Sequence, residues 1–258
     1  MQGYLRTSGR VFVDDSGATV QLRGFGLGGW LVQEGYMWNT SGFYGSTSMI
    51  QQKIIELVGD SAASQFYNDY YLAYITETDV IQLSDWGFNC LRVPFHYKLF
   101  SPDTGVFVED GFNILDPLLE WCSNNQIYII LDMHCAPGGQ NRNDFSDGDG
   151  NEAGLWAHEY NRDWTVAIWQ YIANHYAESE WIGGYDLINE PVLEGSFTSG
   201  DLRQFYIDIA DAIRTVDQNH ILFIEGNWYG NDFTSLTPPF DDNMAYSFHH
   251  YVGPSDQT

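Results

Sequence analysis

The sequence contains few basic residues. Lys and Arg together number 10, against 35 Asp and Glu in 258 residues, which leaves a formal net charge of −25 at pH 7. Phosphate groups are bound chiefly by Lys and Arg, so this balance excludes a protein that binds nucleic acid or an anionic membrane surface. No run of apolar residues is long enough to span a bilayer. The charge fits a soluble protein that acts on a neutral polymer.

Cysteine is also scarce, at 3 residues. The odd number and the lack of a CxxC spacing indicate neither a disulfide framework nor a zinc motif. Cys90 and Cys122 lie in apolar stretches, and we expect them to be buried thiols. The chain begins Met1-Gln2-Gly3 and shows no signal peptide, which is expected if a leader has been removed.

The acidic stretch 144–152 does not match a calcium loop, because it lacks Gly and Glu at the required positions. We interpret it as a solvated surface loop. His158 and His175 have acidic neighbours, so a divalent metal at an interface is conceivable, although their spacing does not support one.

Aromatic residues, by contrast, are abundant: 9 Trp, 17 Tyr and 16 Phe, in a chain that is 44% hydrophobic. This composition predicts a folded protein with a large core. Most of the aromatic residues are expected in that core, and some in a cleft where flat rings stack on sugars.

The chain is predicted to form one domain over residues 1–258. A hairpin of Arg10–Val13 and Thr19–Arg23 comes first. Strands and helices then alternate. The predicted strands are Gln21–Gly26, Asn89–Phe95, Tyr128–His134, Ile182–Asn189, Ile221–Gly226 and Ala245–His250. The predicted helices are Ser48–Val58, Ala63–Trp86 with a possible break, Phe112–Asn124, Trp164–Tyr176 and Leu202–Thr215.

Apolar strands separated by helices predict an α/β fold with a covered parallel sheet. We expect a TIM-type (β/α) barrel. Such a barrel has eight strands, so this chain is expected to be truncated to about six βα units and to lack the last two.

Polar groups follow every predicted barrel strand, and the clearest case is Asn189-Glu190-Pro191 after the apolar run 182–188. Taken alone, this motif is also compatible with a turn that caps the next helix. Since the carboxyl ends of parallel strands meet at one mouth, Arg92, His134, Glu190 and His249 are expected to converge there.

This pattern resembles glycoside hydrolase family 5, the retaining β-glycanases, over essentially the whole chain. The matching motifs are Leu91-Arg92-Val93-Pro94, His134, Asn189-Glu190-Pro191 and His249-His250-Tyr251. The resemblance implies that Glu190 is the acid/base and that Asn189 donates to the sugar 2-hydroxyl. It further implies that Arg92 holds the nucleophile ionised, while His134, His249 and Tyr251 orient substrate and carboxylates.

Two further segments look like the branch that includes exo-acting β-1,3-glucanases and some bacterial β-glucanases. They are residues 22–34, with Gly28-Gly29-Trp30-Leu31 and Glu34, and the loop 136–141. The expected substrate contacts are Trp30, Glu34, Tyr97, Asn141 and Trp228.

The family places its nucleophile, a glutamate, after a seventh strand, which is not predicted here. The nucleophile is therefore unassigned, with Glu225 as a weak candidate and Glu34 and Glu152 as other acids. A carboxylate from a second copy is a further option. Open sheet edges predict a homodimer or a swapped assembly.

We expect a β-glucan hydrolase, endo-β-1,4-glucanase or cellulase-like, that acts on polysaccharide or oligosaccharide. Exo-β-1,3-glucanase, mannanase and a catalytically impaired carbohydrate-binding remnant are the alternatives. The mechanism requires no cofactor, and the substrate class implies an extracellular, secreted protein.

Overall fold

The computed structural model describes residues 3–40 and 45–251. Its N-terminal part is a three-stranded antiparallel sheet of β1 (Arg6–Ser8), β2 (Val11–Val13) and β3 (Thr19–Val20). The predicted hairpin accounts for two of these strands. The first was missed because three residues of mixed polarity are too short to show an alternation.

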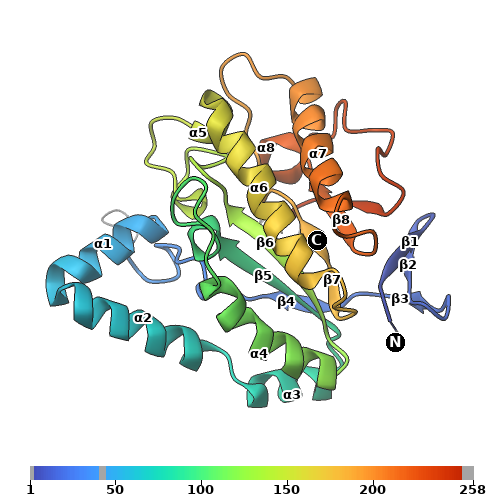
Figure 1. Ribbon diagram of the computed structural model, residues 1–258, viewed down its shortest axis with the longest axis horizontal. Helices are drawn as coiled ribbons and strands as arrows, with labels where there is room; N and C mark the ends of the chain where they lie inside the picture. Colours follow the sequence, from blue (N-terminus) through green and yellow to red (C-terminus); the bar gives the residue numbers. More distant parts are fainter. Residues whose placement is uncertain (1–2, 41–44, 252–258) are drawn as a thin grey trace, which may run out of the picture.

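The main sheet has six parallel strands in sequence order, β4-β5-β6-β7-β8-β9, with helices packed around it (Figure 1). These strands are β4 (Gly24–Gly26), β5 (Cys90–His96), β6 (Tyr128–Cys135), β7 (Ile182–Asp186), β8 (Ile221–Glu225) and β9 (Met244–Ser247). Neighbours in sequence are neighbours in space, as in a (β/α) barrel. The predicted α/β class with six strands is confirmed.

The helices are α1 (Thr47–Val58), α2 (Asp60–Tyr74), α3 (Glu77–Asp85), α4 (Asp110–Asn124), α5 (Gly154–Ala157), α6 (Glu159–Tyr176), α7 (Ser199–Arg214) and α8 (Asn227–Gly230). Two 3₁₀ turns are η1 (Tyr97–Leu99) and η2 (Asp144–Ser146). The predicted helix Ala63–Trp86 is broken in two. Ile75 is extended, and Thr76 with Asp79 forms a capping box that starts α3.

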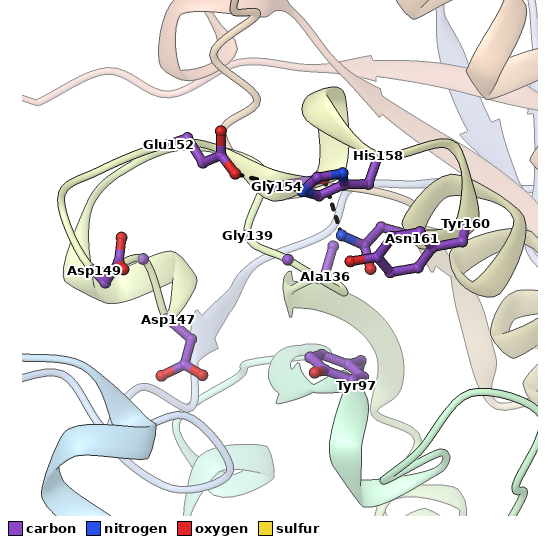
Figure 2. Close-up of a pocket in the computed structure, with 12 residues that line it drawn as sticks. Tyr97, Ala136, Gly139, Asp147, Asp149, Glu152, Gly154, His158, Tyr160 and Asn161 are labelled. Carbon is purple, nitrogen blue, oxygen red and sulfur yellow. Dashed lines mark hydrogen bonds and ion pairs between the residues drawn. The ribbon is translucent and has the colours of Figure 1, made fainter.

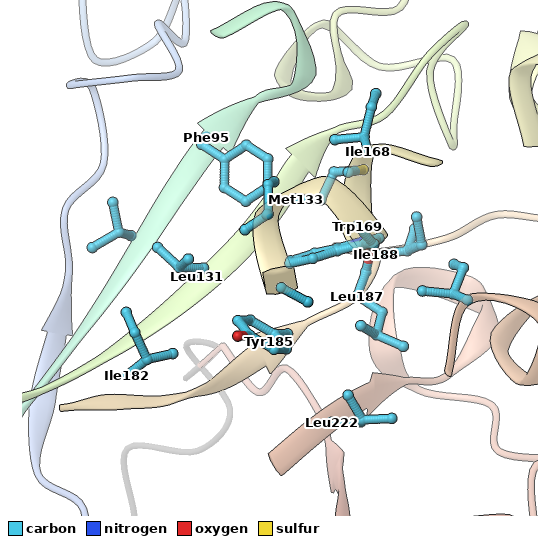
Figure 3. Close-up of a cluster of buried hydrophobic side chains, with 14 of the residues drawn as sticks. Phe95, Leu131, Met133, Ile168, Trp169, Ile182, Tyr185, Leu187, Ile188 and Leu222 are labelled. Atoms are coloured by element: carbon cyan, nitrogen blue, oxygen red, sulfur yellow. The ribbon is translucent and has the colours of Figure 1, made fainter. Parts of the chain in front are cut away.

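The hydrophobic core lies between the sheet and the helices (Figure 3). Strands β6, β7 and β8 are almost fully buried along their lengths, as expected for a sheet with covered faces. Trp169 of α6 is buried against Phe95 and Tyr185, and its indole N–H donates to the Leu187 carbonyl at 2.9 Å. That bond ties α6 to the segment that follows β7.

The N-terminal sheet packs at the amino ends of the barrel strands. Its Leu5 and Val20 form a second buried cluster with Tyr128, Ile221 and Phe223. The Thr7 N–H also donates to the Asn243 side chain at 2.8 Å, just before β9. The amino end of the parallel sheet is thereby covered, and its carboxyl end carries the polar groups described next.

All three cysteines are free and buried, as predicted for Cys90 and Cys122. Within the described ranges, no helix combines the length and apolar character needed to cross a bilayer.

Candidate active site

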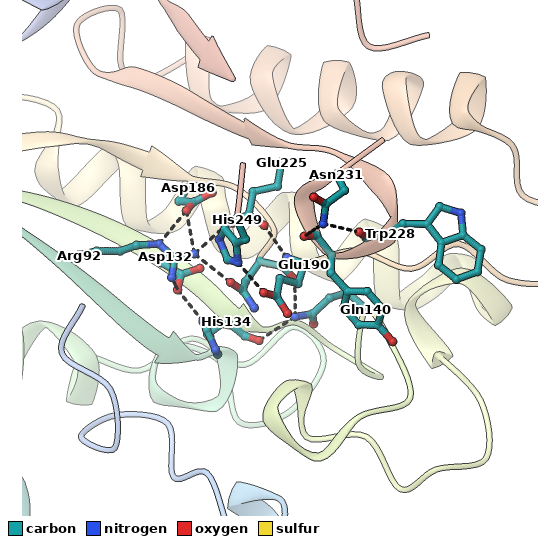
Figure 4. Close-up of polar contacts among 12 residues, drawn as sticks. Arg92, Asp132, His134, Gln140, Asp186, Glu190, Glu225, Trp228, Asn231 and His249 are labelled. Atoms are coloured by element: carbon teal, nitrogen blue, oxygen red, sulfur yellow. Dashed lines mark hydrogen bonds and ion pairs between the residues drawn. The ribbon is translucent and has the colours of Figure 1, made fainter. Parts of the chain in front are cut away.

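Arg92 of β5 is the centre of an ion network at the carboxyl end of the sheet (Figure 4). Its guanidinium lies 3.0 Å from Asp132 of β6, 2.9 Å from Asp186 of β7 and 3.1 Å from Glu225 of β8. It also donates to the Asn189 Oδ1 atom at 2.9 Å. One cation therefore ties together four neighbouring strands and the segment after β7. Burial alone would lower the pKa of Arg92, but these three carboxyl groups raise it.

Three carboxyl groups around one guanidinium do not all ionise easily. Burial, followed by the charge of Glu225, raises the pKa of Asp186 well above its usual range. Asp132 faces a second partner, because its Oδ2 atom lies 2.7 Å from the His134 Nδ1 atom.

Glu190 stands just past β7, in a backbone conformation that few residues with a Cβ adopt. Its φ is +47°. Its N–H donates to the Glu225 Oε2 atom at 2.7 Å, and its carbonyl accepts from the Asn141 amide at 2.9 Å. Both backbone polar groups of Glu190 are thus bound by buried side chains, which fixes the direction of its own side chain.

His249, which follows β9, lies between the carboxyl groups of Glu190 and Glu225. Its Nδ1 atom is 2.5 Å from Glu190 Oε1 and its Nε2 atom is 2.9 Å from Glu225 Oε1. Burial alone would lower the pKa of His249, but the hydrogen bonds to these two carboxyl groups raise it to about 10. His249 is therefore an imidazolium at neutral pH.

The loop after β6 supports this cluster through two buried amides. Gln140 donates from Nε2 to the carbonyl groups of His134 and Asn189, at 2.7 and 2.8 Å. Asn141, predicted to contact substrate, instead binds the Glu190 carbonyl and accepts from Ser146 and Asn143. It is 1% exposed, so its side chain is committed to the protein.

Trp30 is a second correction among the predicted substrate contacts. Its side chain is buried, and its indole N–H donates to the Tyr71 carbonyl at 3.0 Å. A ring enclosed in this way does not present a face to a sugar. Trp228 is 58% exposed and, with φ of +54°, has a left-handed backbone that turns its indole outward. Tyr251 is exposed as well.

Glu225 was the weak candidate for the nucleophile. Its side chain is fully buried, and its two oxygens are bound to Arg92, to His249 and to the Glu190 N–H. Both carboxyl oxygens of Glu225 already have partners within the protein, one of them the Glu190 N–H.

Glu34 is partly buried in the loop after β4. Burial raises the pKa of Glu34, the charge of His134 lowers it, and the charges of Asp144 and Glu190 raise it further. These influences show that its carboxyl group is within electrostatic range of the Glu190 cluster.

Tyr97 lines a pocket of about 330 Å³ beside the loop after β6, and the residues of the Glu190 cluster are not part of its lining (Figure 2). Gly138, Gly139 and Glu152 line it as well, and His158 lies 3.4 Å from Glu152.

The acidic loop is exposed at Asp144, Asp149 and Glu152, as predicted, but not at Asp147. Asp147 is largely buried. Its carboxylate accepts hydrogen bonds from the backbone N–H and the hydroxyl group of Ser48 in α1, and its Oδ2 atom lies 3.0 Å from the His96 Nε2 atom. Within the described part of the chain, no group of three or more His, Cys, Asp or Glu residues is arranged to hold a metal. His175 pairs with Asp116 instead.

The sequence prediction assigned no role to Asp132, Asp186 or Gln140. The available signal was a charged residue inside an otherwise apolar strand, which is costly unless it is paired. Gln140 had no such signal, because a loop amide looks like surface.

A family model described as cellulase (glycosyl hydrolase family 5) matches residues 45–258. A β-xylosidase of Phanerodontia chrysosporium is 34% identical over 252 residues, which is 96% of this chain and 52% of that protein. Endoglucanase C of Acetivibrio thermocellus is 30% identical over 72% of this chain and 53% of that protein. The chain spans about half the length of the curated relatives it matches.

Solved structures show the same fold. A rutinosidase from Aspergillus niger superposes with a TM-score of 0.76 and 19% identity, over 90% of this chain and 69% of that one. A β-glucanase from Saccharophagus degradans, solved with cellotetraose, has a TM-score of 0.65 and 18% identity over 97% of this chain and 62% of that one. Since the family model matches residues 45–258 and a curated relative is 34% identical over 96% of the chain, the chain belongs to glycoside hydrolase family 5.

Proposed function

We propose that this chain carries the proton-donor half of a β-glucan hydrolase, with Glu190 as the acid/base. The observation that carries the proposal is the fixation of Glu190. Its N–H, its carbonyl and one carboxyl oxygen each bind a different side chain, those of Glu225, Asn141 and His249. Structures maintain such strained backbone where a side chain must point in one direction.

The His249 imidazolium donates to the Glu190 carboxyl group and holds that side chain in place. In the proposed reaction Glu190 donates a proton to the glycosidic oxygen as its bond to the sugar breaks. Arg92 and His249 then balance the negative charges of Glu225 and Glu190.

Asn189 is the second group assigned to substrate. Its Oδ1 atom is bound by Arg92, while its buried Nδ2 atom has no partner among the described residues. A buried amide donor without a partner is costly, and a sugar hydroxyl removes that cost. We assign it to the 2-hydroxyl, where hydrogen bonds strengthen as the transition state forms. His134 and Tyr251 stay proposed as further substrate contacts.

The exposed Trp228 ring is proposed as a stacking platform for a glucosyl unit. Tyr97 keeps its proposed role in the adjacent pocket. A retaining mechanism also needs a nucleophilic carboxylate about 5–5.5 Å from the acid. The buried Glu225 does not supply it, so we assign no nucleophile within residues 3–40 and 45–251.

The proposed preference is for endo cleavage of β-1,4 or mixed-linkage glucan. Exo-β-1,3-glucan, mannan and xylosyl substrates are the alternatives, since curated relatives include a probable glucan 1,3-β-glucosidase and a β-xylosidase. A secreted location follows from a polymeric substrate. No cofactor is assigned.

The test is the release of reducing sugar from barley β-glucan by the purified 258-residue chain. Glu190→Gln is expected to lower kcat/KM on β-glucan by on the order of 10²-fold or more, because the shape is kept and the proton is lost. Aryl β-glucosides with acidic leaving groups are expected to lose much less. Glu178→Gln, an exposed change at the opposite end of the sheet, is the matched control.

Equal activity of Glu190→Gln and wild type on both substrates contradicts the assigned role. If the wild type binds β-glucan in affinity electrophoresis and releases no reducing sugar, the chain is a carbohydrate-binding remnant, the alternative from a different class.

A further inference from the structure

The loop 27–34 runs from the edge strand β4 to Glu34 and has a sheet neighbour on one side only. On that side the Leu27 N–H donates to the Arg92 carbonyl at 2.9 Å, and Leu31 forms a parallel bridge with Phe95. Because β4 is the first strand of the sheet, no strand of the described residues flanks its other side. Something else must hold the loop there.

Helix α2 does so with a row of tyrosines. Tyr67, Tyr70 and Tyr74 are spaced by three and four residues, so they lie on one face of the helix. The Tyr74 hydroxyl donates to the Gly28 carbonyl at 2.6 Å and that of Tyr70 to the Gly29 carbonyl. The Tyr67 hydroxyl donates to the Gln33 Oε1 atom at 3.0 Å.

Two further contacts fix the same loop. The Trp30 ring stacks on Tyr74, with the planes 9° apart, and its N–H binds the α2 backbone. The backbone of Gln33 makes two hydrogen bonds with the Thr47 hydroxyl group. The Gln33 N–H donates to that hydroxyl at 2.9 Å, and the hydroxyl donates to the Gln33 carbonyl at 3.0 Å. The loop is therefore bound residue by residue up to the position before Glu34.

These hydrogen bonds restrict the position of Glu34, the last residue of the loop. The loop lies at the carboxyl end of the sheet, because Leu31 forms a parallel bridge with Phe95, one residue before the end of β5. The charges of His134 and Glu190 also act on the pKa of Glu34. The Glu34 side chain has no hydrogen bond of its own in the described structure that would aim it. The backbone on both sides of Glu34 is bound, since Gln33 bonds to Thr47 and the Gly35 N–H donates to the Gly45 carbonyl at 2.8 Å.

We propose that Tyr67, Tyr70 and Tyr74 are positioning residues that hold Glu34 at the wall of the active site, where its carboxylate binds hydroxyl groups of the glucan. This inference rests on the proposed function for the nature of the ligand, and on the hydrogen bonds of α2 for the positioning. Phenylalanine rings would fill the same space between α2 and the loop. The three tyrosine hydroxyl groups are needed only for their hydrogen bonds to the loop.

The test removes hydroxyl groups and leaves the rings in place. Tyr70→Phe/Tyr74→Phe frees the Gly28 and Gly29 carbonyls, and the single Tyr74→Phe is the milder variant if the double variant folds poorly. Tyr71→Phe is the matched control, because that hydroxyl has no hydrogen bond in the described structure while its carbonyl still binds Trp30. Far-UV circular dichroism verifies folding.

The first readout is the titration of the Glu34 carboxyl by ¹³C NMR, assigned with Glu34→Gln. In wild type the pKa of Glu34 is raised by burial. In the double variant it is expected to fall towards its ordinary value as the loop loosens, and to stay unchanged in Tyr71→Phe.

The second readout is the binding of cellotetraose in a Glu190→Gln background. The double variant is expected to bind about 5 to 30-fold more weakly, since it removes two hydrogen bonds that hold the loop, each worth about 1 kcal/mol. Hydrolysis by the double variant is expected to show a raised KM and little change in kcat.

An unchanged Glu34 titration together with unchanged cellotetraose affinity in the double variant overturns the positioning role. Failure of the wild type to cleave any glucan overturns the proposed function instead, and the titration still decides whether the tyrosines position Glu34.

Discussion

The positive φ of Glu190 is a local cost that its surroundings offset. A non-glycine residue in this region is strained by about 1–3 kcal/mol. The two bonds made by its backbone, from Asn141 and to Glu225, are to side chains that are 1% and 0% exposed. The acid at the centre of the site is therefore oriented by groups that do not reach solvent.

His249 makes the stability of the protein depend on pH. Its pKa in the folded state is about 10, above the value of about 6.5 expected when unfolded. The folded state therefore binds the proton more tightly, and this contribution is complete below about pH 6.5. It is lost as pH rises towards 10.

The expected outcome is a fall in the free energy of unfolding of wild type, relative to His249→Gln, between about pH 6.5 and 10. Urea unfolding at a series of pH values measures this difference, which isolates His249 from tyrosines that titrate in the same range. Parallel pH profiles for the two proteins would show that the imidazolium is not stabilised.

The positions of site residues were predictable where a motif marked the end of a strand. Arg92, Glu190 and His249 follow or end apolar strands, and the structure brings them together. The roles of Asn141 and Trp30 were not predictable, because an amide or an indole contacts substrate or protein according to the loop path alone. That path depends on contacts with distant residues, such as Glu190 and Tyr71.

At the scale of elements, the loop 136–152 is anchored to α1 by one carboxylate. Asp147 accepts two hydrogen bonds from Ser48 and lies beside His96 at the end of β5. Burial alone would raise the pKa of Asp147, but the hydrogen bonds and charge of His96 and Ser48 lower it below its usual range. Its contribution to stability is present above about pH 4 and is lost as pH falls further.

Asp147→Asn is expected to destabilise the protein by about 1.5–3 kcal/mol at pH 7, the range for hydrogen bonds to a charged group. Asp149→Asn, an exposed change in the same loop, is the control and is expected to cost less. Chemical denaturation at pH 7 and pH 3 measures both. Equal costs for the two variants, or a gap that persists at the lower pH, would contradict the role given to Asp147.

The element boundaries show where sequence patterns stop being informative. Apolar runs located β5 to β9 within a few residues. The end of β7 was predicted at Asn189, and the regular strand ends at Asp186. Backbone bonding to the neighbouring strands continues beyond it, because the Leu187 N–H donates to the Phe223 carbonyl and the Asn189 N–H to the Met133 carbonyl. The break between α2 and α3 was readable from the capping residues Thr76 and Asp79.

At the scale of the whole molecule, β4 and β9 are the two edges of the six-stranded sheet. Parallel strands normally have neighbours on both sides, and open edges pair readily with other chains. Strand β9 is only partly buried apart from Met244. We therefore keep the proposal that the 258-residue chain self-associates as a homodimer or a swapped assembly.

Sedimentation velocity from 1 to about 100 μM is expected to show a sedimentation coefficient that rises with concentration. A variant with Lys at Ala245 and at Ser247 places charge along β9 and is expected to shift the equilibrium towards monomer. A single compact species at every concentration would mean that the β9 edge does not mediate association.

The ion pairs of Arg92 affect how the sheet unfolds. The partners of Arg92 stand on β6, β7 and β8, and Glu225 passes the connection on to His249 beyond β9. Separating any one of these strands leaves a buried charge without its counterpart, which costs several kcal/mol. The sheet from β5 to β9 therefore resists opening one strand at a time. Its slowest-exchanging amides should report a single cooperative unit, with local fluctuation confined to β4 and the surface loops.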